Sequence, residues 1–208
     1  MKTFYDLGTH LFEGLLEFNQ YFKFDETWKI YCFEANPHTY AEAKKKLETH
    51  DLLKTFNIEF INAAVSDSNG TTEFECYYDL EAESYIDVGS TAFALRDDYF
   101  KDIHKDASYA QMGEKYCRVE TIPTINFSEF IDKNSKYGDD VFIKMDIEGC
   151  EFATLTKMIQ DNTHTLAKQM FIEWHERFWP NEQDKYVNWK NQILFKLAND
   201  RVDAKIWW

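Results

Sequence analysis

The chain has 208 residues, 44% of them hydrophobic and 17% aromatic, so it is long enough to bury the core of one globular domain. Its formal net charge of −14 leaves no general basic surface, and we expect no nucleic-acid partner. The sequence has no run of 18 apolar residues and no signal-peptide pattern, so we expect no membrane contact and a cytoplasmic protein.

Strands and helices alternate along the first third of the chain. The hydrophobic patterns predict strands at 3–6, 28–34 and 58–65, and helices at 11–22 and 39–49. In such an alternation, right-handed crossovers cover both faces of a parallel sheet with helices and bring the carboxyl ends of the strands to one rim. We therefore predict an α/β fold with a mostly parallel central sheet and a binding site at that rim.

The middle of the chain is less regular. Residues 66–70 are a cluster of turn formers, and the strand expected at 71–78 predicts a hairpin-like extension. No clear period runs through 79–116, and we expect an insertion at about 79–117 that serves as a lid or substrate loop. Regular patterns resume with strands at 118–122, 141–146, 170–174 and 203–208, and helices at 127–133, 151–160 and within 182–197. No repeat or linker divides the chain, so residues 1–208 are predicted to form a single domain.

The four cysteines are Cys32, Cys76, Cys117 and Cys150. They are far apart in the sequence and form neither a C-x-x-C pair nor the linear spacing typical of a zinc site. We expect reduced, mostly buried thiols, in agreement with an intracellular protein.

Two of the predicted strands end on a carboxylate inside a tight polar turn. Asp6 precedes Gly8, and Glu34 follows Gly8 by 26 residues, close to the spacing at which a second-strand acid binds both ribose hydroxyls of a nucleotide or nucleoside. A dinucleotide fingerprint needs three glycines, whereas only Gly8 and Gly14 are present. We therefore expect a nucleoside site without a pyrophosphate cradle, with Asp6 available to a cationic amino group.

Three carboxylates crowd the turn that follows the strand at 141–146. Asp146, Glu148 and Glu151 stand where this strand leads into a helix, and such crowding raises a pKa or calls for a cation. An acid in the first turn of a helix also interacts favourably with the helix dipole, which accounts for Glu151. We therefore interpret Asp146 as a residue that takes part in the chemistry and Glu151 as a residue that stabilises the start of the helix.

Four ordered motifs then carry a family resemblance. They are Asp-Leu-Gly-Thr-His at 6–10, Phe-Glu-Ala-Asn-Pro at 33–37, Asn-Ala-Ala-Val-Ser-Asp at 62–67, and Ile-Lys-Met-Asp-Ile-Glu-Gly-Cys-Glu at 143–151. Over residues 4–173 the sequence resembles the FkbM family of S-adenosylmethionine-dependent methyltransferases. The resemblance implies a Rossmann-like methyltransferase fold and O-methylation of a sugar or glycan hydroxyl, for instance on a deoxysugar such as rhamnose.

The resemblance also implies roles for individual residues. Asp6, Gly8, Thr9 and His10 would hold the methionine part of the cofactor. Glu34 would bind the ribose, with Ala35 and Asn36 in the same cofactor-binding turn. The adenine region would contact Asn62, Ala63, Ala64 and Asp67, and Asp146 would face the methyl group.

A sugar hydroxyl is a poor nucleophile, so the site needs a group that assists its deprotonation. The segment at 172–177 supplies Glu173 and His175 just beyond another strand end, and we expect Asp146, Glu148 and His175 to be the catalytic residues. His175 would act as general base, or Asp146, Glu173 and His175 would bind Mg²⁺ or Mn²⁺ as in metal-dependent O-methyltransferases with a similar layout. The sequence leaves both alternatives open.

Two other functions compete with this interpretation. A nicotinamide-dependent oxidoreductase would share Glu34 and the sheet, but the glycine fingerprint is missing. A non-catalytic methyltransferase-like binding module would keep the fold without needing Asp146, Glu173 and His175 together. The terminal pair Trp207 and Trp208 is expected to pack in the core or to form a subunit contact in a homo-oligomer.

Overall fold

A computed structural model describes residues 1–79, 84–85 and 117–207. Most of the lid predicted at about 79–117 therefore lies outside the described residues. The strands are β1 (Lys2–Leu7), β2 (Trp28–Glu34), β3 (Ile58–Asn62), β4 (Ala64–Ser66), β5 (Gly70–Asp79), β6 (Ser84–Tyr85), β7 (Cys117–Asn126), β8 (Asp140–Met145), β9 (Gln169–Ile172) and β10 (Asp203–Ile206). The α-helices are α1 (Glu13–Phe22), α2 (Pro37–Thr49), α5 (Phe127–Asn134), α6 (Glu151–Gln160) and α7 (Gln183–Asn199).

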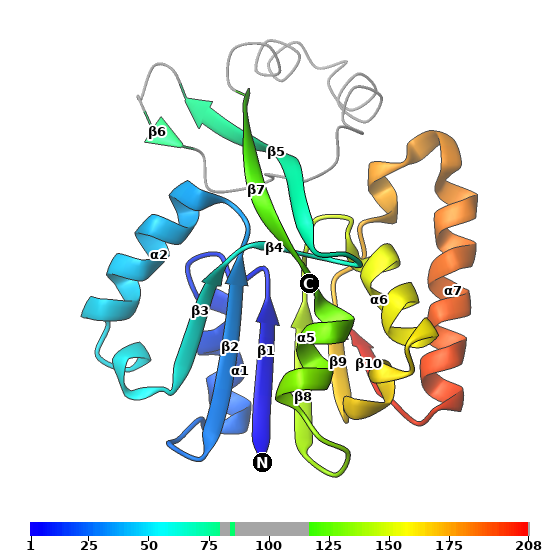
Figure 1. Cartoon of the computed structure of the whole chain (residues 1–208), viewed down its shortest axis with the longest axis horizontal. Helices are drawn as coiled ribbons and strands as arrows, with labels where there is room; N and C mark the ends of the chain where they lie inside the picture. The colour runs from blue at the N-terminus through cyan, green and yellow to red at the C-terminus, as the bar shows by residue number, and fades with distance from the viewer. Residues whose placement is uncertain (80–83, 86–116, 208) are drawn as a thin grey trace.

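The central sheet has six strands in the order β10-β9-β8-β1-β2-β3. Every neighbouring pair in it is parallel, so all six strands point their carboxyl ends toward the same rim (Figure 1). This confirms the α/β fold with a parallel central sheet. The order reverses between β1 and β8, which is the position at which open α/β sheets bind their ligands.

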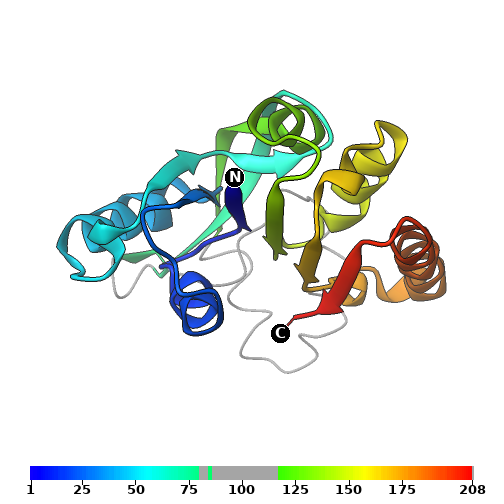
Figure 2. The same cartoon turned by 90° about the horizontal axis from the view of Figure 1, so that it is seen from below.

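Both faces of this sheet are covered, because side chains along β1 alternate between two apolar clusters. Phe4 packs with residues of α1 and α2 on one face, while Tyr5 and Leu7 pack with residues of α5, α6 and α7 on the other. Figure 2 shows α1 on one side of the strands and α5 and α6 on the opposite side. The strands are buried on both faces, which explains their nearly continuous apolar sequences.

A second, smaller sheet departs from the prediction. The strand expected at 58–65 is two strands, because the chain leaves the central sheet between β3 and β4. The second sheet has the order β4-β7-β5-β6, in which β5 is antiparallel to β7 and β4 is parallel to β7. The extension is therefore formed by β5 and the distant β7, and the predicted hairpin with the preceding strand was wrong. The residues at this change of sheet are all buried: Ala63, Ala64 and Val65. The apolar run in the sequence therefore continues through the change of sheet and does not indicate where it occurs.

The cysteine expectation agrees with the described residues, in which Cys32, Cys76 and Cys150 are reduced and buried. The side chain of Cys117 is outside the described part. Among the helices that the structure describes, none has the length and apolar character needed to cross a membrane.

Candidate active site

A cavity of about 440 Å³ opens at the carboxyl ends of β1, β2 and β8. Its lining comes from the turns that follow these strands, from the β3–β4 junction, and from the end of the chain. Lining residues that the sequence predicted for the cofactor are Gly8, Thr9, His10, Glu34, Ala35, Asn36, Ala63, Ala64 and Asp146. The cavity thus lies at the rim where the strand order reverses, in agreement with the expected position.

Gly8 lies where the ends of β1 and β8 come closest. Its φ is +78°, and a Cβ built on it would lie 1.8 Å from the backbone oxygen of Asp146. The Asp146 backbone N–H donates to the Leu7 carbonyl oxygen at 3.0 Å, which holds the two strand ends together. Only glycine fits here, because other residues have a Cβ and rarely adopt this φ.

Glu34 is fixed at the cavity wall by two backbone donors. The His10 N–H donates to Oε2 at 2.9 Å and the Asn36 N–H donates to Oε1 at 2.9 Å. Burial raises the pKa of Glu34, while these two hydrogen bonds oppose the increase. Each carboxylate oxygen keeps a further lone pair, so the residue is suited to accept hydrogen bonds from the two hydroxyls of a ribose. The position of these acceptor oxygens therefore fits a nucleoside cofactor.

Asp6 lies beneath the cavity instead of in its described lining. It is 1% exposed, accepts a hydrogen bond from Thr9 Oγ1 at 2.5 Å and lies 3.6 Å from Lys144 Nζ. Burial raises the pKa of Asp6, and the charge of Lys144 opposes that increase. Asp6 therefore shapes the turn of Thr9 and His10 from below, a placement that differs from direct contact with a ligand's amino group.

Only some of the residues expected around the adenine line the cavity. Ala63 and Ala64 line the cavity, whereas Asn62 Nδ2 donates to the carbonyl oxygens of Glu34 and Ala35 at 2.8 and 3.3 Å. Asn62 therefore braces the turn that carries Glu34. Asp67 is exposed and accepts hydrogen bonds from Ser66 and Ser68, and it is not among the described residues of the lining.

Lys144 and Trp207 line the cavity, although the sequence assigned neither to the site. Lys144 Nζ donates to the Gly8 carbonyl oxygen at 2.5 Å, lies 3.3 Å from Asp146 Oδ2, and lies 4.7 Å from the centre of a Trp207 ring. Burial lowers the pKa of Lys144, but the charges of Asp6 and Asp146 outweigh this and raise it. The only signal for Lys144 was its place in a strand that is otherwise apolar, and Trp207 lies 63 positions further along the chain.

At the β8/β9 side of the rim, acidic side chains surround a buried histidine. The Nε2 atom of His175 is 3.8 Å from Asp146 Oδ1, 3.7 Å from Glu148 Oε2 and 3.6 Å from Glu173 Oε1. Asp146 and Glu148 also line the cavity. The cluster is therefore continuous with the cavity, and three of its members are the residues predicted to be catalytic.

Glu151 holds the other side of the His175 ring. Its carboxylate is fully buried and accepts the backbone N–H groups of Ile147 and Gly149, and Oε1 lies 2.9 Å from His175 Nδ1. The expectation that Glu151 serves only the helix dipole was incomplete, because that explanation fits any acid at a helix start. The histidine it contacts is 24 residues further on, a distance over which sequence patterns carry no pairing signal.

The protonation of His175 follows from these contacts. Burial lowers the pKa of the ring, but Glu151, Glu148 and Asp146 outweigh that effect and raise the pKa to about 9. Without a cation, His175 therefore carries a proton at neutral pH and has no free lone pair with which to act as a base.

The same cluster has the donor atoms of a cation site. One ligand atom each from Asp146, Glu173 and His175 lies within 4.8 Å of the other two. Two carboxylates with one imidazole, and a buried carboxylate behind the imidazole, suit Mg²⁺ or Mn²⁺ and match the way proteins orient a metal-binding histidine. The residues present thus fit the cation that the sequence left as an alternative.

The aromatic residues near this cluster are core residues. Trp174 and Trp179 are 6% and 7% exposed and belong to the apolar cluster with Phe152. The Trp179 ring stacks on Tyr186 with 3.8 Å between centroids. Their side chains therefore stabilise the packing between α6 and α7 and offer little flat surface to a ligand.

Comparison with known proteins identifies the family of the chain. No curated protein gives a significant match. The crystal structure of Methyltransferase FkbM from Methylobacillus flagellatus KT at 2.20 Å resolution aligns with 93% of this chain and 37% of its own, at 14% sequence identity and a TM-score of 0.47; this chain thus spans little more than a third of that protein. Residues 6–201 match the family described as the Methyltransferase FkbM domain. Since this match includes nearly the whole sequence, the chain belongs to the FkbM methyltransferase domain family.

Proposed function

We propose that this methyltransferase transfers a methyl group from S-adenosylmethionine to a hydroxyl of a sugar or glycan. We further propose that a divalent cation held by Asp146, Glu173 and His175 assists the reaction. The observation that carries the proposal is that a cavity suited to a nucleoside and a cluster suited to a cation share one residue, Asp146. A methyl donor and an activated acceptor would then meet at that side chain.

On the cofactor side, bound S-adenosylmethionine supplies the electrophilic methyl group. Glu34 would accept hydrogen bonds from the ribose hydroxyls, because its carboxylate is already oriented by His10 and Asn36. Thr9 and His10 would hold the methionine part at the turn that Gly8 makes possible. These groups would hold the cofactor in the cavity that Asp146 also lines.

On the acceptor side, the cation would bind a sugar diol and lower the pKa of the reacting hydroxyl. Glu151 would keep the ring of His175 in position. Glu148 lines the cavity and lies outside the three-residue ligand set, so we assign it to accepting the hydroxyl proton. The alternative is that His175 itself acts as base, which would require it to lose its proton before the reaction.

The cofactor assignment is tested by calorimetric titration of the purified protein with S-adenosylhomocysteine. We expect binding to the wild type and a loss of roughly 10- to 100-fold in affinity for Glu34→Gln, the range of a hydrogen bond to a charged group. Glu59→Gln is the matched control, because Glu59 is half exposed and pairs with Lys29 away from the cavity. Binding of NAD in place of S-adenosylhomocysteine would overturn the assignment.

The acceptor assignment is tested by transfer of a labelled methyl group to a panel of monosaccharides and glycans, in EDTA and then in Mg²⁺ or Mn²⁺. We expect transfer only with cation, and its loss in Asp146→Asn and Glu173→Gln but not in Glu182→Gln, whose acid pairs with Lys185 at the surface. Transfer that persists in EDTA but is lost in His175→Gln would favour a histidine base. Cofactor binding without transfer to any hydroxyl would favour a non-catalytic module.

A further inference from the structure

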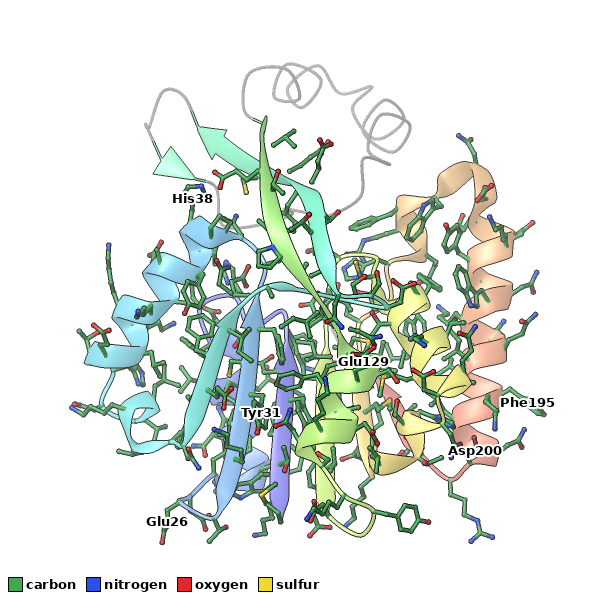
Figure 3. All side chains as sticks on the ribbon, in the orientation of Figure 1. Glu26, Tyr31, His38, Glu129, Phe195 and Asp200 are labelled. Carbon is green, nitrogen blue, oxygen red and sulfur yellow. The ribbon has the colours of Figure 1, made fainter. Side chains whose placement is uncertain are left out.

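A second group of metal-binding side chains lies apart from the acidic cluster. It consists of His38, Cys76 and Glu120, and one ligand atom from each lies within 4.8 Å of the other two. These residues come from α2, β5 and β7, which are distant in the sequence. Figure 3 labels His38 at the end of α2 that lies next to the extension formed by β5 and β7.

The antiparallel pairing of β5 with β7 brings the thiol and the carboxylate to one face. Phe74 is opposite Glu120 and Cys76 is opposite Arg118 in this pairing. Opposed residues point to the same side of an antiparallel pair, so Cys76 and Glu120 are diagonal neighbours on one face. Cys76 is fully buried and packs in a small apolar cluster with Phe74 and Ile122, which holds its side chain toward the α2 side.

The start of α2 supplies the third group. The backbone N–H of His38 donates to Asn36 Oδ1, the capping side chain of this helix, at 2.9 Å. The imidazole reaches across to β7, where Nε2 lies 2.5 Å from Glu120 Oε1. Both side chains are about one third exposed, so this contact alone would be an ordinary, weakly stabilising surface ion pair. The neighbouring thiol adds the donor that distinguishes the group from such a pair.

We propose that His38, Cys76 and Glu120 bind one Zn²⁺, with a water in the fourth position. A sulfur, a nitrogen and an oxygen donor form the kind of mixed set that Zn²⁺ accepts in tetrahedral sites, whereas Mg²⁺ and Mn²⁺ prefer oxygen. On binding, the Cys76 thiol loses its proton to solvent and coordinates as the thiolate. The site is separate from the cluster of Asp146, Glu173 and His175, and it does not depend on the function proposed above.

Zinc at this position would tie the β5–β7 pair to the wall of the cofactor cavity. His38 lies two residues after Asn36, the last residue of the turn that lines the cavity with Glu34 and Ala35. Ala35 also packs against the apolar cluster that contains Cys76. The ion would therefore fix the second sheet against the turn that carries Glu34.

The experiment uses the full chain, first treated with EDTA and dialysed, then titrated with Co²⁺ as a spectroscopic substitute for Zn²⁺. We expect a thiolate-to-cobalt charge-transfer band that saturates at one equivalent and disappears when Zn²⁺ displaces the cobalt. The band should be lost in Cys76→Ser and kept in Cys150→Ser, which tests a second buried thiol. It should also remain in Glu173→Gln, which removes a ligand of the acidic cluster.

Variants of the two half-buried ligands, His38 and Glu120, cover the case in which Cys76→Ser does not fold. His38→Ala and Glu120→Gln should weaken Zn²⁺ binding at least about tenfold, with circular dichroism unchanged. Two results would overturn the proposal. One is the absence of a charge-transfer band in the folded wild type. The other is a band of equal affinity in His38→Ala and Glu120→Gln.

Discussion

The two sides of the rim handle negative charge in different ways. On the β1/β2 side, Glu34 is held by two backbone N–H groups of neighbouring turns. On the β8/β9 side, carboxylates face one imidazole from several directions at 3.6 to 3.8 Å. On the β1/β2 side, the hydrogen bonds from the backbone already stabilise the carboxylate. On the β8/β9 side, several carboxylates concentrate negative charge that a cation would balance. In the proposed function, the β1/β2 side would bind the cofactor and the β8/β9 side would activate the acceptor.

Lys144 connects the two sides, and its removal should have the largest effect. Lys144→Met would leave Asp6 and Asp146 without the cation between them, at a cost of about 3–5 kcal/mol in the free energy of unfolding. Urea denaturation would measure it. Lys205→Met is the control, because Lys205 is half exposed and pairs with Asp203 at the edge of the sheet. A loss below about 1 kcal/mol for Lys144→Met would show that the two sides do not share this charge.

Gly8→Ala tests the contact between the strand ends on the β1/β2 side. Its Cβ would collide with the Asp146 carbonyl, so we expect a loss of about 3 kcal/mol in stability together with loss of S-adenosylhomocysteine binding. Gly138→Ala is matched to it, with a φ of +93° but nothing within 4 Å of the added Cβ, and should cost about 1 kcal/mol. Equal melting temperatures for the two variants would contradict the steric argument.

Glu151→Gln sharpens the comparison on the β8/β9 side. The carboxylate accepts hydrogen bonds from the N–H groups of Ile147 and Gly149. In the amide, an NH₂ donor would replace one of these acceptor oxygens, and the hydrogen bond that positions the His175 ring would weaken. We expect a loss of about 2 kcal/mol in stability and a 10- to 100-fold weaker affinity for Mn²⁺. Calorimetry with Mn²⁺ provides the second value. If affinity fell only as much as in Glu182→Gln, a positioning role for Glu151 would be ruled out.

Cation addition should give the smallest effect and should act on the β8/β9 side alone. At Mn²⁺ concentrations about tenfold above its dissociation constant, binding adds about 1.4 kcal/mol, which raises the melting temperature by about 3–6 °C for a chain of this size. Asp146→Asn should abolish the increase, while His38→Ala should keep it. An increase that survives in Asp146→Asn would place the cation elsewhere.

Sequence patterns predicted the central elements well, because these elements are buried on both faces. The ranges 28–34 and 151–160 agree with β2 and α6. The break between β3 and β4 was missed, since Ala63 to Val65 stay buried while the backbone changes sheets. Where burial continues across a change of direction, hydrophobic periodicity carries no information about that change.

The same reasoning explains which parts of the site were predictable. Gly8, Glu34 and Asp146 follow strand ends, and parallel strands bring such ends together, so their presence in the cavity lining was foreseeable. Other parts of the site are contacts between distant segments. They are the contact of Lys144 with Trp207, that of Glu151 with His175, and the group of His38, Cys76 and Glu120. Such contacts depend on side-chain directions within the folded molecule. The functional roles of the site residues stay predictions until the variants above are measured.

The position of Trp207 has a practical consequence for work with this protein. Trp207 lines the cavity, and Gly14 lies under its ring with 3.4 Å between the ring and an added Cβ. The ring of Trp207 thus closes part of the cavity wall, whereas β1 begins at the opposite side of the sheet from this cavity (Figure 1). Immobilisation chemistry therefore belongs on the side of the sheet where β1 begins, because groups attached there are distant from the cavity.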